Sequence, residues 1–480
     1  MSTEVARRIP LIIGGKENTT RAQVAVNSHT FPEESIHTFT SFDINDTKLY
    51  RELFDSANKG FEEWSATPYN EKIKVFQKAV VLLKERKDEF FKSHHEIGGP
   101  SWFAGFNVDG TVDQLEEYIS QMSNPTGVLP QSLESKLAIT IKQPIGPVLA
   151  IAPWNAPILL AARSIAAPLA AGCSVIHKSS EKSPLASYLF VKCLHDAGLP
   201  KDALQLVHVA PQDNPQFLNE VLSSGTIKKL NFTGSTAVGT KIATVAANYL
   251  IPYLLELGGK NFSIVRKDAD LDKAVGNIVW SSWSHKGQIC MSTDKVYIHE
   301  DIYDEFKERL QKVAPEVAKD PDYSICQRDP VFTKKIIELV EDAVSKGANI
   351  LYGNIDKEKV LKTNSVPPLI LEDVNEDSIL NNTESFGPLF SIHKYNDEAQ
   401  LIKDLNVNSY GLKATIWSQN ILEAIDIAKN IETGAVHINS SSVHDEVTIP
   451  HGGVKGSGQG RFNSSWGLDE FNIIKTITLN

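Results

Sequence analysis

Short, almost wholly apolar segments alternate with amphipathic segments through the middle of the chain. Segment 183–197 is the clearest amphipathic one, with Ser183 as a good helix N-cap, Pro184 at the first helical position and Gly198 after the helix. Buried strands that alternate with helices are typical of parallel βαβ units, so the pattern predicts an open, doubly wound sheet. The predicted strands are 148–151, 174–177, 204–209, 229–232 and 253–257.

A second region with the same alternation begins near residue 261, and its helices are expected at 271–283 and 303–317. Upstream of both regions, apolar residues at helical spacing predict helices over 46–64 and 71–94. The chain is therefore expected to be an α/β protein with two doubly wound regions. The strands of the second region are predicted at 262–265, 295–299, 389–393, 414–417 and 435–438.

Two further segments alternate apolar and polar residues over their length, as half-buried strands do. They are residues 136–146 and residues 471–480. Because both lie outside the two α/β regions, we predict that they form a small separate sheet, with another subunit as the candidate to complete it.

Polar or glycine-rich loops follow four of the strands predicted in the first region. Ligands of doubly wound sheets bind outside the carboxyl ends of the strands, where these loops would lie. Four such loops on one predicted edge are the strongest indication of a binding site in the residue pattern. The loops are 152–155, 178–181, 233–239 and 258–260.

Residues of these loops suit a nucleotide. Gly234 and Gly239 lie in a turn between a strand and a helix, where backbone N–H groups and the helix dipole favour an anion. Lys178 and Glu181 supply a cation and a carboxylate of the kind that holds ribose hydroxyls. The turn lacks the G-x-G-x-x-G fingerprint, so a tight β-to-α turn and a solvated loop remain alternatives for these residues.

Three other residues suggest catalysis. Cys290 follows Gly287 in a turn, and a thiolate is the strongest side-chain nucleophile, although a lone cysteine is more often a small buried residue. Glu256 ends an apolar strand, where a carboxylate must be hydrogen-bonded or poised as a base. Asn155 lies between prolines that would hold its amide toward an oxyanion, but taken alone a turn role explains it better.

Composition narrows the partners and the location. The 480 residues are too many for one core. The net charge of −11 comes without a dense basic run, so nucleic acid and anionic membranes are not expected partners. Prolines interrupt the apolar stretch 147–176, which therefore does not predict a membrane span. The four cysteines suit neither a disulfide framework nor a zinc site and no hydrophobic signal region precedes them, so we expect no metal and a cytoplasmic protein.

Short motifs follow one another along almost the whole chain. They are Pro153-Trp154-Asn155, Lys178-Ser-Ser-Glu181, Phe232-Thr-Gly-Ser235, Leu255-Glu-Leu-Gly-Gly-Lys260, Gly287-Gln-Ile-Cys290, Glu384-Ser-Phe-Gly-Pro388 and Pro450-His-Gly-Gly-Val-Lys455. In order and spacing the motifs resemble the NAD(P)-dependent aldehyde dehydrogenase superfamily. A chance match of so many motifs in order is not a serious alternative.

The resemblance implies a catalytic role for three residues. Cys290 would attack the aldehyde to form a thiohemiacetal, while Asn155 and the Cys290 backbone N–H hold the oxyanion. Hydride transfer to the nicotinamide would leave a thioester, and Glu256 would activate the water that hydrolyses it.

The resemblance also implies the cofactor site. Lys178 and Glu181 would hold the adenine ribose, Ser235 the pyrophosphate, and Glu384 the nicotinamide ribose, with Phe386 beside the ring. Glu181 favours NAD because a carboxylate would repel a 2′-phosphate, and the nearby Lys178 keeps NADP possible. The full implied set is Trp154, Lys178, Glu181, Gly234, Ser235, Gly239, Leu257, Glu384 and Phe386.

The architecture that the resemblance implies has two doubly wound α/β domains and a small oligomerisation sheet, in a homodimer or homotetramer. Its domains would be a dinucleotide-binding domain (1–126 and 147–258), a catalytic domain (259–449) and oligomerisation strands (127–146 and 462–480).

Segments 154–160 and 441–446 look like the branch that oxidises salicylaldehyde, vanillin and benzaldehyde. Ala156 is small where many relatives carry an aromatic residue, which leaves room for a ring beside Cys290. His451 departs from the family, which usually has Phe at this position. The alternatives are an aliphatic or semialdehyde dehydrogenase, a CoA-acylating relative, which generally lacks a base at the position of Glu256, and a non-catalytic structural relative.

Overall fold

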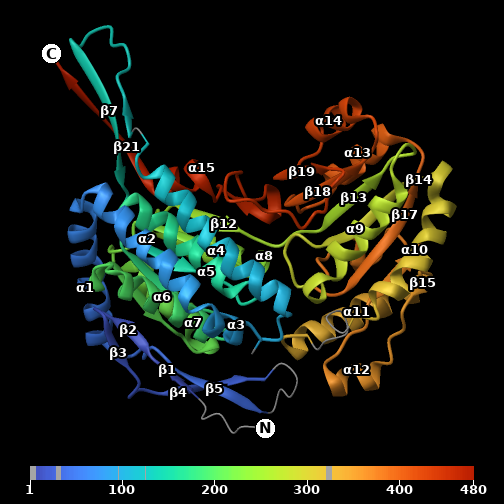
Figure 1. Ribbon diagram of the computed structural model, residues 1–480, viewed down its shortest axis with the longest axis horizontal. Coiled ribbons are helices and arrows are strands. Elements are labelled where there is room, and N and C mark those ends of the chain that lie inside the picture. Colours follow the sequence, from blue (N-terminus) through green and yellow to red (C-terminus); the bar gives the residue numbers. More distant parts are fainter. Residues whose placement is uncertain (1–6, 29–33, 96, 125, 321–326) are drawn as a thin grey trace.

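In the computed structural model the chain forms two α/β regions, with a narrow arm of strands that projects away from them (Figure 1). The structure describes residues 7–28, 34–95, 97–124, 126–320 and 327–480. Each region is built on one large, mainly parallel sheet. The predicted α/β class with two doubly wound sheets is confirmed.

The first sheet has eight strands, and the five that the sequence predicts are parallel and adjacent. Its β20 edge strand comes from much later in the chain and runs antiparallel to β12. The order is β20 (Gly458–Gln459), β12 (Tyr253–Glu256), β11 (Lys229–Thr233), β8 (Val148–Ile151), β9 (Val175–Lys178), β10 (Leu204–Val207), β2 (Leu11–Ile13) and β3 (Lys16–Asn18).

Alternate residues of β8 enter two separate hydrophobic cores, because successive side chains of a strand point to opposite faces. Val148 and Ala150 enter one core and Leu149 enters the other. Burial on both faces explains why β8 is apolar at successive residues rather than alternating. The first core includes residues of α2 (Tyr69–Glu85), α4 (Ser101–Gln121), α5 (Pro157–Ala171) and α6 (Pro184–Ala197), and the second includes residues of α1 (Thr47–Ala66), α7 (Asn214–Ser223) and α8 (Thr236–Asn248).

The second sheet has seven strands, which include all five that the sequence predicts. Ile264 packs with α13 (Glu398–Val407) and α14 (Ile421–Lys429), whereas Val265 packs with α9 (Leu271–Trp283) and α10 (Tyr303–Val317). The sequence does not predict the edge strand β15 and its neighbour β16, which are covered by α11 (Pro330–Ser345) and α12 (Lys357–Thr363). The order is β15 (Asn349–Tyr352), β16 (Leu369–Glu372), β17 (Leu389–Tyr395), β14 (Thr293–His299), β13 (Asn261–Val265), β18 (Lys413–Trp417) and β19 (Ala435–Ile438).

The N-terminal part differs from the sequence prediction in two ways. The single helix predicted over 71–94 is divided at Arg86 into α2 and α3 (Lys87–His95). Asp88 and Glu89 lie in the first turn of α3, where carboxylates favour a new helix start. A small sheet that was not predicted has the order β1 (Arg7–Ile9), β5 (Ser35–Thr40) and β4 (Gln23–Asn27).

The arm is the small separate sheet that the two alternating segments predict. Strand β21 (Asn472–Leu479) pairs antiparallel with β7 (Leu137–Pro144) along its whole length, and β6 (Gly127–Val128) adds a short third strand. The arm stands clear of both regions (Figure 1). The domain boundaries themselves stay a prediction.

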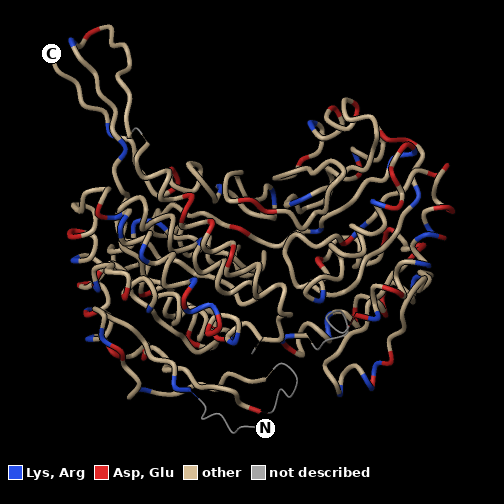
Figure 2. The backbone as a smooth tube through the Cα atoms, in the orientation of Figure 1, with Lys and Arg blue, Asp and Glu red and all other residues tan. Residues whose placement is uncertain are grey.

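Segment 147–176 forms β8, a loop and α5, as predicted, with Pro157 in the first turn of the helix. Within the described ranges, no helix is both long and apolar enough to cross a membrane. Lys and Arg are interspersed with Asp and Glu over both regions (Figure 2).

Candidate active site

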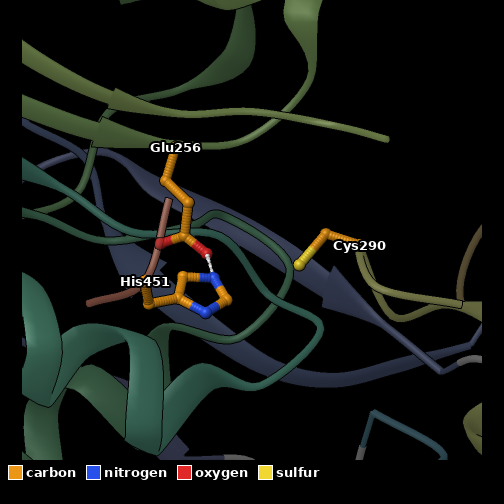
Figure 3. A group of neighbouring side chains, drawn as sticks. All are labelled: Glu256, Cys290 and His451. Carbon is orange, nitrogen blue, oxygen red and sulfur yellow. Dashed lines mark hydrogen bonds and ion pairs between the residues drawn. The ribbon is translucent and has the colours of Figure 1, made fainter. Parts of the chain in front are cut away.

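Cys290, Glu256 and Asn155 come from three separate parts of the chain and line one pocket. Glu256 ends β12, Asn155 lies between β8 and α5, and Cys290 lies between α9 and β14. The Cys290 Sγ, a Glu256 carboxylate oxygen and a ring nitrogen of His451 all lie within 4.8 Å of one another (Figure 3). The structure therefore brings together the residues that the sequence singled out for catalysis.

The turn before Cys290 is strained. His285 and Lys286 have φ of 49° and 62°, and Gly287 follows with φ of 68°. Left-handed backbone at a residue other than glycine costs about 1–3 kcal/mol and persists only where the surroundings fix it. A Cβ at Gly287 would lie 2.0 Å from the carbonyl oxygen of Gly387, so only glycine fits this position.

Hydrogen bonds from two asparagine amides fix the loop that carries Cys290. Asn155 Nδ2 donates to the Gln288 carbonyl at 3.0 Å. Asn261 Nδ2 donates to the carbonyls of Cys290 and Ser292 at 2.8 and 2.9 Å. The Asn155 amide carries a second N–H, which remains for a ligand in the pocket.

The Cys290 thiol has a pKa well above its ordinary value. Burial is the main cause, and the negative charges of Glu256 and Glu384 add to it. At neutral pH Cys290 is therefore held as a thiol rather than as the reactive thiolate.

Glu256 is buried among hydrogen-bond donors. Its Oε1 accepts from His451 Nε2 at 2.7 Å, its Oε2 accepts from Thr233 Oγ1 at 3.3 Å, and both oxygens lie 3.4 Å from Arg163 Nη1. Burial alone would raise the pKa of this carboxyl, but His451 and Arg163 outweigh burial and lower the pKa to about 2.

Asp445 completes a cluster with Glu256, Arg163 and His451. It forms an ion pair with Arg163 Nη2, and its Oδ1 lies 3.3 Å from His451 Nδ1. Burial would lower the pKa of His451, but Asp445 and Glu256 outweigh burial and raise it above 6.5. A buried carboxylate is tolerated only when it is paired in this way.

The rest of the pocket wall is apolar and aromatic. Phe103 and Phe106 of α4 stack with ring centroids 5.9 Å apart, and Ala156 lies next to Asn155 at the start of α5. The remaining apolar wall is formed by Leu159, Leu160, Ile289, Met291 and Val443.

The residues expected at the cofactor site lie near the carboxyl ends of the strands of the first sheet. Trp154 and Phe386 are in edge-to-face contact with centroids 5.9 Å apart. Lys178 ends β9 and lies 3.9 Å from the carboxylate of Glu181.

The glycine turn after β11 lies beside β12. Gly234 N–H donates to the Glu256 carbonyl at 3.0 Å. Ser235 is the N-cap residue of α8 but makes no side-chain capping bond, so its hydroxyl is not committed to the helix. A Cβ at Gly239 would lie 2.5 Å from the Leu257 side chain, so the absence of a side chain at Gly239 lets α8 pack closely against the end of β12.

Glu384 is a half-buried carboxylate whose Oε1 accepts a hydrogen bond from Gly259 N–H at 3.1 Å. Burial raises its pKa to about 7. A Cβ at Gly258 would lie 2.5 Å from Glu384 Oε2, so the absence of a side chain leaves space at this carboxylate. A carboxylate with spare acceptor capacity suits ribose hydroxyls, and the free Ser235 hydroxyl suits a phosphate. These residues thus fit a dinucleotide.

Sequence reasoning missed the partners of Glu256 and most of the pocket wall. Arg163 carried a signal, because it is the one charged residue in the apolar segment 157–171 and such a charge requires a buried partner. His451 differs from the Phe that is usual in the family, but this difference does not identify it as a partner of Glu256. Phe103 and Phe106 have helical spacing that ordinary core residues share.

Comparisons with known proteins identify the family of the chain. The chain matches the aldehyde dehydrogenase family over residues 20–477. The chain belongs to this family. It is accordingly an NAD(P)⁺-dependent oxidoreductase of aldehydes.

Several relatives of this dehydrogenase act on aromatic aldehydes. It is 35% identical to vanillin dehydrogenase of Pseudomonas sp. (strain HR199 / DSM 7063), with 98% of each chain covered. It is similar to the crystal structure of a salicylaldehyde dehydrogenase from Pseudomonas putida G7 complexed with salicylaldehyde, with a TM-score of 0.92, 31% identity and 99% and 98% of the two chains covered. It is also 32% identical to the mitochondrial succinate-semialdehyde dehydrogenase of Arabidopsis thaliana, over 90% of this chain and 82% of that one.

The charge of Glu256 makes a testable contribution to the reactivity of Cys290. Because Glu256 raises the pKa of the thiol, Glu256→Gln is expected to speed alkylation of Cys290 by iodoacetamide at pH 8 by about threefold or more. Mass spectrometry of the Cys290 peptide measures the rate. Glu446→Gln, at an exposed carboxylate, is the control and should leave the rate unchanged. An equal or slower rate in Glu256→Gln would contradict the assignment.

Proposed function

We propose that this dehydrogenase oxidises aromatic aldehydes to carboxylic acids with NAD⁺, through a thioester on Cys290. The observation that carries the proposal is the pocket wall, where Phe103, Phe106 and Ala156 line the cavity that holds Cys290. Phe103 and Phe106 can make stacked or edge-to-face contacts with an aromatic substrate ring. The small side chain of Ala156 leaves space for that ring. The vanillin and salicylaldehyde dehydrogenases among the relatives support the same substrate class.

In the first half-reaction the Cys290 sulfur attacks the aldehyde carbon. The Asn155 amide and the Cys290 backbone N–H donate to the oxyanion that forms, and Asn261 keeps the loop in position. Because the Cys290 thiol has a raised pKa, its proton must leave as the substrate binds. The bound dinucleotide supplies the hydride acceptor.

In the second half-reaction water hydrolyses the thioester. Glu256 is the group that takes the proton of this water, since its carboxylate lies within 4.8 Å of the sulfur. A base at this position favours hydrolysis over transfer to CoA.

A semialdehyde dehydrogenase of the same family is the second candidate. Its substrate carries a carboxylate and requires a cation in the pocket. Arg163 lines the pocket, but its guanidinium is already paired with Glu256 and Asp445. The wall therefore favours an uncharged ring.

Substitution of Ala156 tests the substrate class. Ala156→Phe would fill the space proposed for the ring and is expected to lower kcat/KM for benzaldehyde at least about tenfold, with propanal changed less. NADH absorbance measures both rates, and Cys290→Ala should abolish them. Turnover of short aliphatic aldehydes by the wild type at far higher kcat/KM than benzaldehydes would overturn the aromatic assignment.

Preference for NAD⁺ is proposed to come from Glu181. The carboxylate lies 3.9 Å from Lys178 at the end of β9 and would repel a 2′-phosphate. Glu181→Gln is expected to raise the ratio of kcat/KM with NADP⁺ to that with NAD⁺ about tenfold, because it removes the repulsion but keeps the size. The exposed Glu300→Gln is the control. An unchanged ratio would show that Glu181 does not determine the preference for NAD⁺.

We propose that the arm joins subunits in a homodimer or homotetramer. Ile473, Ile477 and Leu479 alternate along one face of β21 and are exposed by 43%, 48% and 60%, which is unusual for apolar residues in a regular sheet. We also propose a cytoplasmic location, which the free thiols of Cys173 and Cys193 support.

The molar mass in solution tests the role of the arm. Wild type is expected at a multiple of 52.9 kDa by light scattering, and the double variant Ile473→Lys with Ile477→Lys at 52.9 kDa, because buried lysines at the interface repel. Thr476→Lys with Thr478→Lys places the same charges on the other face and should keep the oligomer. A monomeric wild type would contradict the proposal.

A further inference from the structure

Four buried side chains form a closed electrostatic cluster beside the sulfur of Cys290. Glu256, His451 and Asp445 lie in series. His451 Nε2 lies 2.7 Å from the Glu256 carboxylate (Figure 3), and His451 Nδ1 lies 3.3 Å from Asp445 Oδ1. Arg163 contacts both carboxylates. His451 is 1% exposed, so its protonation state is set by these neighbours.

The charges of the cluster balance only when His451 is protonated. Two carboxylates face one guanidinium, so a neutral imidazole leaves one net negative charge and an imidazolium leaves none. Glu256 reaches the cluster from β12, Arg163 from α5, and Asp445 and His451 from the segment after β19. Among the described residues, the other titratable groups that interact with the cluster are the Cys290 thiol, Tyr118 of α4, Lys413 of β18 and His437 of β19.

We propose that His451 is a positioning residue that sets the basicity of Glu256, so that thioester hydrolysis proceeds when His451 is neutral and stops when His451 is protonated. The proposal rests on the hydrolytic role of Glu256 given above. It adds a group that lies in the pocket wall and is proposed to act through the carboxylate rather than on the reacting atoms.

The proton balance of the step explains why the state of His451 matters. As water attacks the thioester carbon, a C–O bond forms, the water proton passes to the Glu256 carboxylate, and the C–S bond then breaks to release the acid and the Cys290 thiolate. Beside an imidazolium and Arg163, Glu256 is a very weak base with a pKa of about 2. Beside a neutral imidazole one of the two opposing positive charges is gone, and the carboxylate accepts the proton more readily.

The sign of the pH dependence follows from the neighbours of His451. Asp445 and Glu256 raise the pKa of the imidazole above 6.5, so the inactive, protonated form persists to a higher pH than for an isolated histidine. Hydrolysis is therefore expected to fall as pH drops through the neutral range. In the proposed reaction Glu256 acts as a base only toward the hydrolytic water, so acylation and hydride transfer are expected to lack this dependence on His451.

A single-turnover experiment separates the two half-reactions. Enzyme is mixed with substoichiometric benzaldehyde and excess NAD⁺ between pH 5.5 and 9; NADH absorbance reports acylation, and quenched samples report benzoate release. In the wild type benzoate release is expected to fall about tenfold for each pH unit below the pKa of His451. In His451→Phe and His451→Gln this dependence disappears near neutrality, while the rate of NADH formation stays within about threefold of wild type.

Two variants and one control keep the result interpretable. His451→Gln keeps a polar contact to Glu256 but cannot titrate, so it guards against a packing defect in His451→Phe. His299→Gln, at a histidine of the other sheet, should behave as wild type. An unchanged pH profile in both His451 variants, or benzoate release slowed by the same factor at every pH, would overturn the proposal. Absence of NADH formation by the wild type with any aldehyde would instead overturn the proposed function.

Discussion

The structure depends on the pairing of one buried carboxylate. Glu256 ends an apolar strand, and leaving such a charge unpaired would cost about 3–5 kcal/mol. The compensating groups come from a buried helix, which supplies Arg163, and from the segment that connects the second sheet to the first, which supplies Asp445 and His451. The carboxylate is therefore tolerated only when three parts of the fold are in place together: α5 is packed, the segment before β20 is positioned, and β20 closes the edge of β12. The same agreement places Glu256 beside the sulfur of Cys290.

Sequence alone predicted the two sheets because most residues of their parallel strands are apolar and the strands are separated by helices with clear boundaries. It failed where that contrast is weak. The β1–β5–β4 sheet is made of short, partly polar strands, β15 and β16 lie at an edge, and the break at Arg86 interrupts neither the apolar spacing nor the helical composition. Local patterns carry no information about such features, since tertiary contacts decide them.

The site shows the same division. Cys290, Glu256 and Asn155 stand out because each follows a strand or turn with an unusual local composition. Their partners are harder to find. Arg163 stands out as a lone charge in an apolar segment, but it lies 93 positions from Glu256 and His451 lies 195 positions from it, so the sequence does not show that either residue contacts Glu256. The aromatic wall from α4 is hidden for another reason: rings at helical spacing look the same whether they line a cavity or fill a core.

Strand β20 has a consequence for how the protein is made. It pairs with β12 but is encoded after the entire second sheet, so the first sheet stays open at that side until residues 458–459 exist. A nascent chain that ends before residues 458–459 presents a bare strand edge, which favours pairing with other chains. A chain that ends before His451 also leaves Glu256 without its imidazole partner. Synthesis from the N-terminus therefore cannot yield a finished first region ahead of the second. The two α/β regions therefore complete their folding together. Binding by a chaperone would be most useful while β12 is still unpaired.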